Sequence, residues 1–190
     1  MTPHARWIAA AVLGLGFVFS VASAKEVAGV NVPDTVAVGE AALKLNGAGV
    51  RTRFFIKVYV GALYLTEPQT TAAAALAAPT PKSVRMHVLY DEIAATKLVD
   101  AWNEGFSGNT SDAERVALQP RIDTFNTLFP AVKKGDVVRL DLIGDTTEVW
   151  INQERKGAIA GPDFQQALLK IWLGDKPVDA GLKRALLGGA

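Results

Sequence analysis

The stretch from Leu45 to Leu65 constrains the fold of this chain more than any other. It contains a Gly-rich segment, two arginines, and a run from Phe54 to Leu65 that is rich in aromatic and β-branched residues and lacks proline. The run is too short to span a membrane as a helix and is typical of a strand buried on both faces. Because Asn and Gly tolerate positive φ, Asn46-Gly47 predicts a hairpin turn. Residues 51–65 are then expected to return as one long strand.

Polar side chains interrupt this apolar strand and supply the first candidates for a site. If the extended chain starts at Arg51, alternation places Arg51, Arg53, Phe55, Lys57 and Tyr59 on one side. Buried or half-buried polar groups need partners. The alternative to a binding site, in which the two arginines are simply exposed hairpin residues, stays open at this point.

The first 24 residues have the pattern of a secretory signal peptide. Arg6 gives a positive start, residues 7–19 are apolar, and Ala22-Ser23-Ala24 forms a small-residue cleavage site before Lys25. The alternative is an uncleaved N-terminal anchor. The prediction is therefore a signal peptide over residues 1–24, a single domain over residues 25–190 without an integral membrane span, and a periplasmic or secreted location.

Overall charge and composition limit the classes of function that the sequence suggests. Arg6 is the only Lys, Arg, Asp or Glu in the first 24 residues, so the remaining chain has a formal net charge of zero. That balance suggests neither nucleic acid nor an anionic membrane surface as a partner. The chain has no cysteine, which excludes disulfides, cysteine nucleophiles and thiolate metal sites.

Hydrophobic periodicity predicts strands at both ends of the chain and helices between and after them. Proline and capping signals refine the helices: Asp91 is expected to cap one that Gly105 ends, Ser111 opens the next, and Pro120 should kink or split that one. The predicted strands are 27–32, 35–38, 41–45, 51–65, 82–90, 137–143, 148–152 and 155–159, and the predicted helices are 72–78, 91–104, 111–129, 161–174 and 179–187. This order indicates an α+β fold, a large, mainly antiparallel sheet covered on one face by a layer of helices, as in an open-faced β-sandwich.

Side chains that commonly carry catalysis are sparse. There is no G-x-S-x-G motif, and His87, the only histidine after the leader, falls on the polar side of a strand, where a surface position is expected. The carboxylates lie in caps and turns, so no acid-base pair, metal site or cofactor is predicted. Trp102 and Trp172 fall on apolar helix stripes and are expected in the core. Thr96 and Asn103 share a helix stripe that either lines a pocket or is a solvated flank.

Two segments resemble the chalcone isomerase-like family. The first is L-N-G-A-G-V-R with F-I-K-V-Y-V-G-A-L-Y-L, and the second comprises Gly135-Asp136, Gly161-Pro162-Asp163-Phe164 and I-W-L-G-D-K-P-V-D-A-G-L-K-R-A-L-L-G. The resemblance covers most of residues 40–188. It implies a large antiparallel sheet, a layer of helices over it, and a ligand in a cleft between them.

The resemblance also assigns roles to single positions. Arg51 matches the family's arginine, which polarises the substrate ketone in the plant enzymes and holds a carboxylate in the fatty-acid-binding relatives. Asn103 matches the helix asparagine. Three other family positions differ here, because the catalytic tyrosine falls on Thr96, the strand threonine on Tyr59 and the late substrate-contacting threonine on Ile171.

These departures favour binding over turnover. The ligand-binding candidates are Arg51, Arg53, Tyr59, Thr96, Asn103 and Ile171, and the expected ligand is a fatty acid or similar amphipathic carboxylate. Two alternatives stay open: an isomerase or lyase acting on an enone, with Arg51 as the electrophile, and a structural or chaperone-like periplasmic module. Arg51 and Tyr59 would be about 26 Å apart along a straight strand, so they meet at one headgroup only if the chain bends, for instance at Thr52-Arg53.

Overall fold

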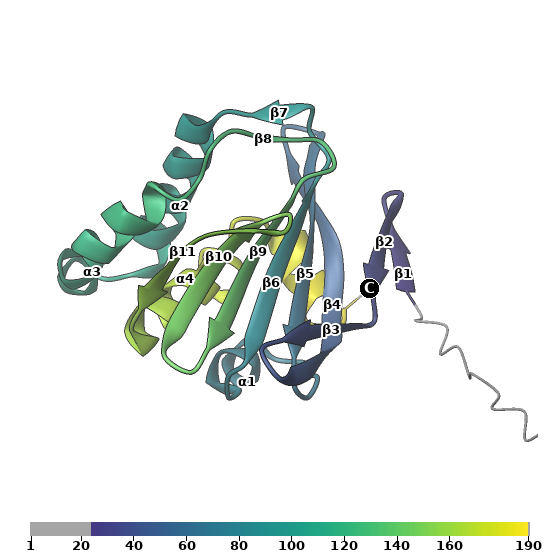
Figure 1. Ribbon diagram of the computed structural model, residues 1–190, viewed down its shortest axis with the longest axis horizontal. Helices are drawn as coiled ribbons and strands as arrows, with labels where there is room; N and C mark the ends of the chain where they lie inside the picture. The colour runs from purple at the N-terminus through teal and green to yellow at the C-terminus, as the bar shows by residue number, and fades with distance from the viewer. Residues whose placement is uncertain (1–23, 190) are drawn as a thin grey trace, which may run out of the picture.

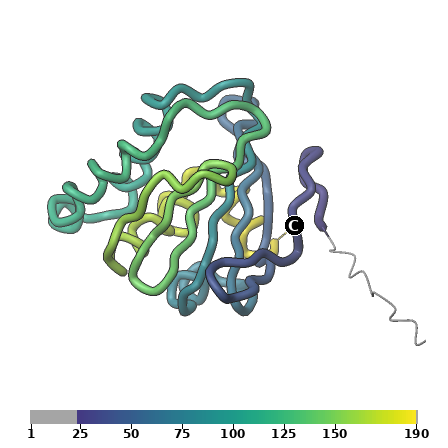
Figure 2. The backbone as a smooth tube through the Cα atoms, in the orientation of Figure 1, coloured from purple at the N-terminus to yellow at the C-terminus, as the bar shows by residue number. Residues whose placement is uncertain are grey.

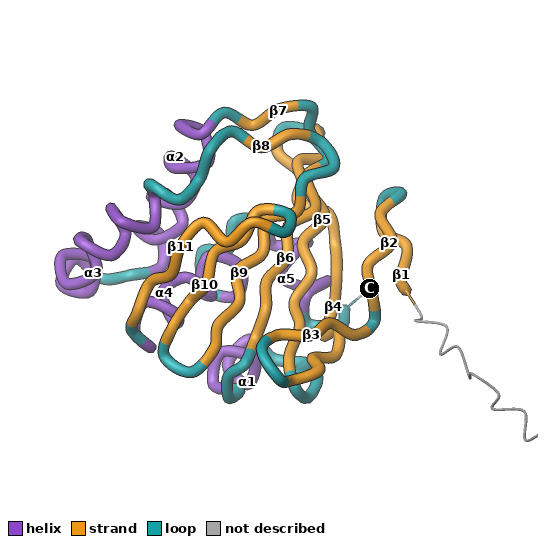
Figure 3. The backbone as a smooth tube through the Cα atoms, in the orientation of Figure 1, coloured by secondary structure: helices purple, strands orange, loops and turns teal. Residues whose placement is uncertain are grey.

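The structure is a computed structural model that describes residues 24–189 (Figure 1). The predicted signal peptide lies outside the described residues except for Ala24. The fold class predicted from the sequence is confirmed: a curled, antiparallel, seven-stranded sheet has helices packed on one face (Figures 1 and 3). No helix of residues 24–189 has the length and apolar character needed to cross a lipid bilayer.

The seven-stranded sheet has the order β11-β10-β9-β6-β5-β4-β3, and two short pairs, β1-β2 and β7-β8, lie beside it. Most strands fall where alternation predicts them. Their bounds are β1 Ala24–Val27, β2 Val30–Pro33, β3 Thr35–Val38, β4 Ala41–Arg53, β5 Ile56–Leu65, β6 Lys82–Val88, β7 Glu92–Ile93, β8 Val132–Lys133, β9 Val137–Ile143, β10 Thr146–Ile151 and β11 Glu154–Ala160.

The hairpin prediction is wrong in its position. The turn between β4 and β5 is Phe54-Phe55, two residues with φ of 48° and 65°, and Arg53 pairs with Ile56 across it. Residues 51–65 are therefore two strands and not one. Asn46 instead lies within β4 at a register shift, where its buried side chain donates to the Leu186 carbonyl at 2.6 Å. Asn46-Gly47 is thus part of a β-bulge that is held by a tertiary hydrogen bond, and not a hairpin turn.

The helices are α1 Ala72–Ala77, α2 Ala95–Asn109, α3 Asp112–Asn126, α4 Pro162–Leu173 and α5 Ala180–Leu186. The predicted capping box at Ser111 is present. Figure 2 shows α2 and α3 at one end of the sheet, with the C-terminal helices behind it.

Three helix predictions fail for physical reasons. Helix α2 begins at Ala95 and not at Asp91, because Glu92 and Ile93 form a strand pair with β8. It also continues through Gly105, which is not a terminator: a Cβ there would lie 2.9 Å from Ile171, so the glycine permits close packing of α2 on α4. Pro120 does not split its helix: it lies inside a continuous α3 on the exposed side, where the carbonyl left unpaired by proline can reach water.

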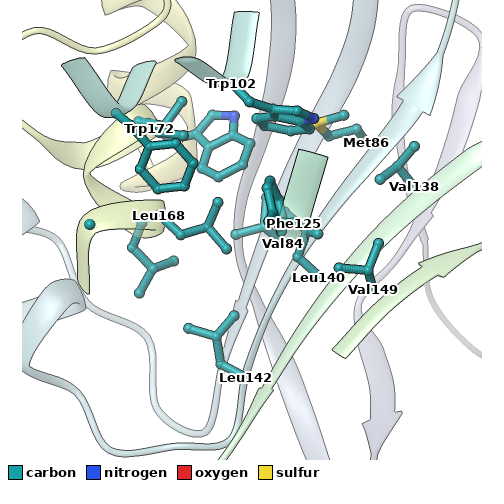
Figure 4. Packing of buried hydrophobic residues seen from close by; sticks show 14 of the residues in the cluster. Val84, Met86, Trp102, Phe125, Val138, Leu140, Leu142, Val149, Leu168 and Trp172 are labelled. Carbon is teal, nitrogen blue, oxygen red and sulfur yellow. The ribbon is translucent and has the colours of Figure 1, made fainter. Parts of the chain in front are cut away.

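The main core lies between the sheet and the helices. Val84, Met86 and Val88 of β6 face inward, and the two predicted core tryptophans, Trp102 and Trp172, are 4% and 1% exposed. Figure 4 shows Val84, Met86 and the two tryptophans converging with Phe125 and with aliphatic side chains of β9, β10 and α4. This packing fixes α2 and α4 against the strands that carry the candidate site.

Candidate functional site

The β4-β5 hairpin brings the two central candidate residues together. Because the chain turns at Phe54-Phe55, Arg51 and Tyr59 are directly paired across the two strands, and the Arg51 Cζ lies 5.6 Å from the centre of the Tyr59 ring. The bend that lets both reach one headgroup therefore exists, three residues beyond Arg51. Directly opposed residues on antiparallel strands point to the same face of the sheet, here the face that the helices cover.

A register shift lies next to this pair. Arg51 pairs with Tyr59 and Thr52 with Lys57, so Val58 is the extra residue of a β-bulge. Simple alternation would place Val58 and Tyr59 on opposite faces. The bulge allows both of them, together with Ile56, to line the same space.

That space, here called the cleft, is an open groove of about 340 Å³. This size is within the range of small-molecule sites, and the side chains are predominantly apolar, as such sites require. It is built from the β4-β5 hairpin, β6, the β7-β8 pair and the start of α2, and its lining residues are Arg51, Arg53, Phe54, Ile56, Val58, Tyr59, Met86, Val88, Tyr90, Glu92, Ile93, Ala94, Lys97, Leu98, Ala101 and Val132.

Arg51 is the cation at the inner side of the cleft. Its side chain is half-buried, its Nε is buried without a hydrogen-bond partner among residues 24–189, and no carboxylate of those residues forms a salt bridge with it. The nearby Asp179 carboxylate instead accepts hydrogen bonds from the backbone N–H groups of Thr52 and Leu182. A half-buried guanidinium with spare donors favours binding of an anion.

Tyr59 supplies a polar group beside this cation. Its ring is 5% exposed, and its hydroxyl oxygen accepts a hydrogen bond of 2.9 Å from Trp172 Nε1. Burial raises the pKa of Tyr59 to about 12, against the opposing effect of the Arg51 guanidinium. The hydroxyl is therefore protonated at neutral pH, and its proton remains available to an acceptor near Arg51.

A second, polar recess of about 330 Å³ begins on the other side of Arg51. It is lined by Arg53 and Lys176 and by the carboxylate-bearing Glu104, among others. Below both openings, a small cavity of about 30 Å³ is bounded by Arg51, Tyr59 and Ile171. Arg51 thus lies where an apolar groove meets a polar one.

The structure brings four of the six candidate residues together. Arg51, Arg53 and Tyr59 line the cleft, and the buried Ile171 lies beneath it. Thr96 and Asn103, however, are exposed and outside the lining, so their solvated-flank alternative describes their position. The reason is helical geometry: α2 turns by about 100° per residue, which places both on the side opposite Ala94, Lys97, Leu98 and Ala101. The Asn103 Oδ1 accepts a hydrogen bond from Asn126 of α3.

Several lining residues were not identified from the sequence. Met86 and Val88 fall within the predicted strand 82–90, but nothing in its alternation showed that they face a groove and not packed helices. The β7-β8 pair, which contributes Ile93 and Val132, is two residues long per strand and leaves no periodic signal. The Trp172 indole was assigned to the core, and its apolar helix stripe gave no sign of the hydrogen bond to Tyr59.

The remaining titratable candidate lies away from the cleft. His87 is half-buried and not simply on the surface, and its Nε2 has no hydrogen-bond partner among residues 24–189. Burial, reinforced by Arg85, lowers its pKa, so the imidazole is neutral at pH 7. Within the described residues, no group of three or more His, Asp or Glu side chains is placed to hold a metal ion.

Fold and site together define an α+β protein with a predominantly apolar cleft between an antiparallel sheet and its helices. A family model described as chalcone isomerase-like matches residues 24–188. The chain belongs to the chalcone isomerase-like family.

The solved structures add a fold likeness. A fatty-acid binding protein from Arabidopsis thaliana superposes with a TM-score of 0.66 at 13% sequence identity, and the match covers 84% of this chain and 92% of the plant chain. No curated protein matches the chain in sequence.

Proposed function

We propose that this chain binds a fatty acid or a similar amphipathic carboxylate in the cleft and does not turn it over. The observation that carries this proposal is the half-buried guanidinium of Arg51, whose Nε has no partner in residues 24–189, next to a predominantly apolar groove. A carboxylate would accept charge-assisted hydrogen bonds from Arg51 and a further one from the Tyr59 hydroxyl. The acyl chain would then cover apolar side chains of β5, β6 and α2.

Two further observations support binding over catalysis. The structurally similar Arabidopsis protein is itself a fatty-acid binding protein. In addition, the hydroxyl beside Arg51 is a poor proton donor, because its pKa is about 12, whereas general acid catalysis works best with a pKa near the working pH. The arrangement therefore suits capture of a charged headgroup better than protonation of an enolate.

Isothermal titration calorimetry with lauric acid and lauryl alcohol tests the proposal. Loss of the headgroup contacts in Arg51→Gln removes about 1.5–3 kcal/mol, so lauric acid should bind about tenfold to hundredfold more weakly. Binding of the alcohol, which carries no charge, should change far less. Arg184→Gln is the matched control, because Arg184 is exposed on α5 and outside the cleft.

The outcomes separate the candidate functions. Equal loss of acid and alcohol binding would mean that Arg51 supports the fold of the cleft and not a headgroup. A larger effect in Arg53→Gln would move the headgroup site to the rim. Flavanone formation from a chalcone, abolished by Arg51→Gln, would overturn the non-catalytic part of the proposal, and failure to bind any acyl ligand would overturn the rest.

We also propose export to the periplasm or medium, on the basis of the N-terminal pattern alone. Cell fractionation followed by mass spectrometry of the intact protein tests this. The expected mass is that of a chain beginning at Lys25, and a cytosolic protein that retains Met1 would contradict the proposal.

A further inference from the structure

The turn of the β4-β5 hairpin carries an exposed apolar cluster next to the cleft. We call residues 53–57 the hairpin tip. Phe55 is 101% exposed, Phe54 82% and Ile56 49%, and two of these residues, Phe54 and Ile56, also line the cleft. Contiguous exposed apolar residues at a site rim are typical of an interaction surface.

The backbone at the tip makes phenylalanine an unexpected choice. Both turn residues have positive φ, the geometry of a type I′ turn, for which Asn and Gly are strongly preferred. Bulky side chains are unfavourable in this conformation. Neither local conformation nor burial therefore favours Phe54-Phe55, and a contact outside the chain would account for them.

The charges beside the tip indicate what it contacts. Arg53 and Lys57 flank the two phenylalanines, both are exposed, and neither forms a salt bridge with any residue of 24–189. Residues 51–60 contain no acid. The nearest acid in the cleft lining, Glu92, lies 3.9 Å from the ammonium of Lys133. A local basic and aromatic tip thus exists on a chain whose overall net charge is close to zero.

We propose that the hairpin tip docks on the surface of an anionic lipid bilayer. Phe54 and Phe55 enter the boundary between headgroups and acyl chains, as amphipathic membrane anchors do, while Arg53 and Lys57 contact lipid phosphates. A bilayer fits better than a protein partner because the tip is convex, with an aromatic apex and basic flanks, and needs no matching pocket. Docking would also place the cleft rim at the membrane surface, where acyl ligands could exchange with the bilayer. This exchange rests on the proposed function, whereas the docking itself does not.

Vesicle co-sedimentation tests the docking. The protein recovered from the soluble extract of the expressing cells, with its N-terminus defined by mass spectrometry, is mixed with vesicles of phosphatidylcholine and phosphatidylglycerol or of phosphatidylcholine alone. We expect binding to the anionic vesicles that weakens with added salt. Changing the apex to the preferred turn pair, Phe54→Asn with Phe55→Gly, should reduce partitioning about tenfold or more while keeping the hairpin folded.

Matched variants separate insertion from charge. Arg53→Gln and Lys57→Gln should each reduce binding to anionic vesicles about fivefold, since a basic residue at such a surface contributes about 1 kcal/mol. Val116→Asn on α3, at a residue 73% exposed, is the apolar control and should leave binding unchanged. In Phe55→Trp, the fluorescence of the introduced tryptophan should be quenched by lipids brominated on their acyl chains.

Three results would overturn the docking proposal. They are equal binding of the turn variant and the unmodified protein, no quenching of the new tryptophan, or sedimentation velocity showing that the tip joins two copies of the chain. The proposed function is tested separately, because titration with lauric acid in the absence of vesicles reports on ligand binding in the cleft alone. A protein that docks but binds no acyl ligand would retain this inference and lose the other.

Discussion

Replacing Gly47 with alanine should destabilise this protein strongly, although the same change is favourable in most strands. Gly47 lies in β4, beneath the C-terminal end of α5. A Cβ at this position would clash with the Ala185 carbonyl oxygen and would lie 2.8 Å from the carbonyl carbon and oxygen of Leu186. These are backbone atoms, so no side-chain rotation relieves the clash.

The expected cost follows from what must move. Overpacking alone costs about 1–3 kcal/mol. If α5 lifts from the sheet instead, Leu182 and Leu186, each 1% exposed, lose their packing, at about 1.5–3 kcal/mol per side chain. We therefore expect a loss of about 3–6 kcal/mol. If α5 did not lie against Gly47, the alanine would instead stabilise the protein by roughly 0.5–1 kcal/mol. The sign of the change in unfolding free energy therefore distinguishes the two cases.

Urea unfolding followed by circular dichroism measures this difference, and Gly108→Ala provides the control. Gly108 lies inside α2 with only Lys176 Cβ at 3.8 Å from the added methyl, so this substitution should stabilise the protein by up to about 1 kcal/mol. A Gly47→Ala protein as stable as the unmodified one would refute the close approach of α5 to β4. A destabilised Gly108→Ala protein would show that the space beside Gly108 does not accommodate a methyl group.

Two smaller predictions concern ionisation. The pKa of Tyr59 is raised to about 12, so the contribution of the protonated hydroxyl to stability is complete below pH 10 and is lost as the pH rises toward 12. In Tyr59→Phe, the fall of the unfolding free energy at alkaline pH should therefore be smaller by up to about 3 kcal/mol. The Arg121 guanidinium, bound to Asp163 by two hydrogen bonds of 2.6 Å, holds the pKa of that carboxyl at about 2. In Arg121→Gln, an NMR titration should find the Asp163 pKa raised from this value toward its ordinary range, while the backbone hydrogen bond from Phe164 keeps part of the lowering.

Much of the fold follows from local patterns. Alternation located most strands of the large sheet, and the capping signals at Ser111 and Asp179 mark the starts of α3 and α5 correctly. The errors arise where a distant segment overrides a local preference. Asn46-Gly47 has strong turn chemistry, yet α5 packs against it from 140 residues away in the sequence and takes the Asn46 amide as a hydrogen-bond partner.

The hairpin shows the opposite case. Phe54-Phe55 has no turn signal, and a chain that avoids Asn, Gly and Pro at this point looks like a continuous strand. The misplaced turn also separated Arg51 from Tyr59 in the one-strand interpretation, although the structure pairs them directly. Composition could not reveal the basic tip either, because its cations are balanced by acids elsewhere in the chain.

The cleft depends on irregularities that no periodic pattern predicts. The bulge at Val58 lets Ile56, Val58 and Tyr59 share one face, and the two-residue strand pair β7-β8 extends the groove beyond the sheet. The sequence could therefore identify Arg51 as a chemically unusual residue in an apolar stretch. Only the departure from regular pairing explains why this arginine borders an open groove and has no carboxylate partner in residues 24–189.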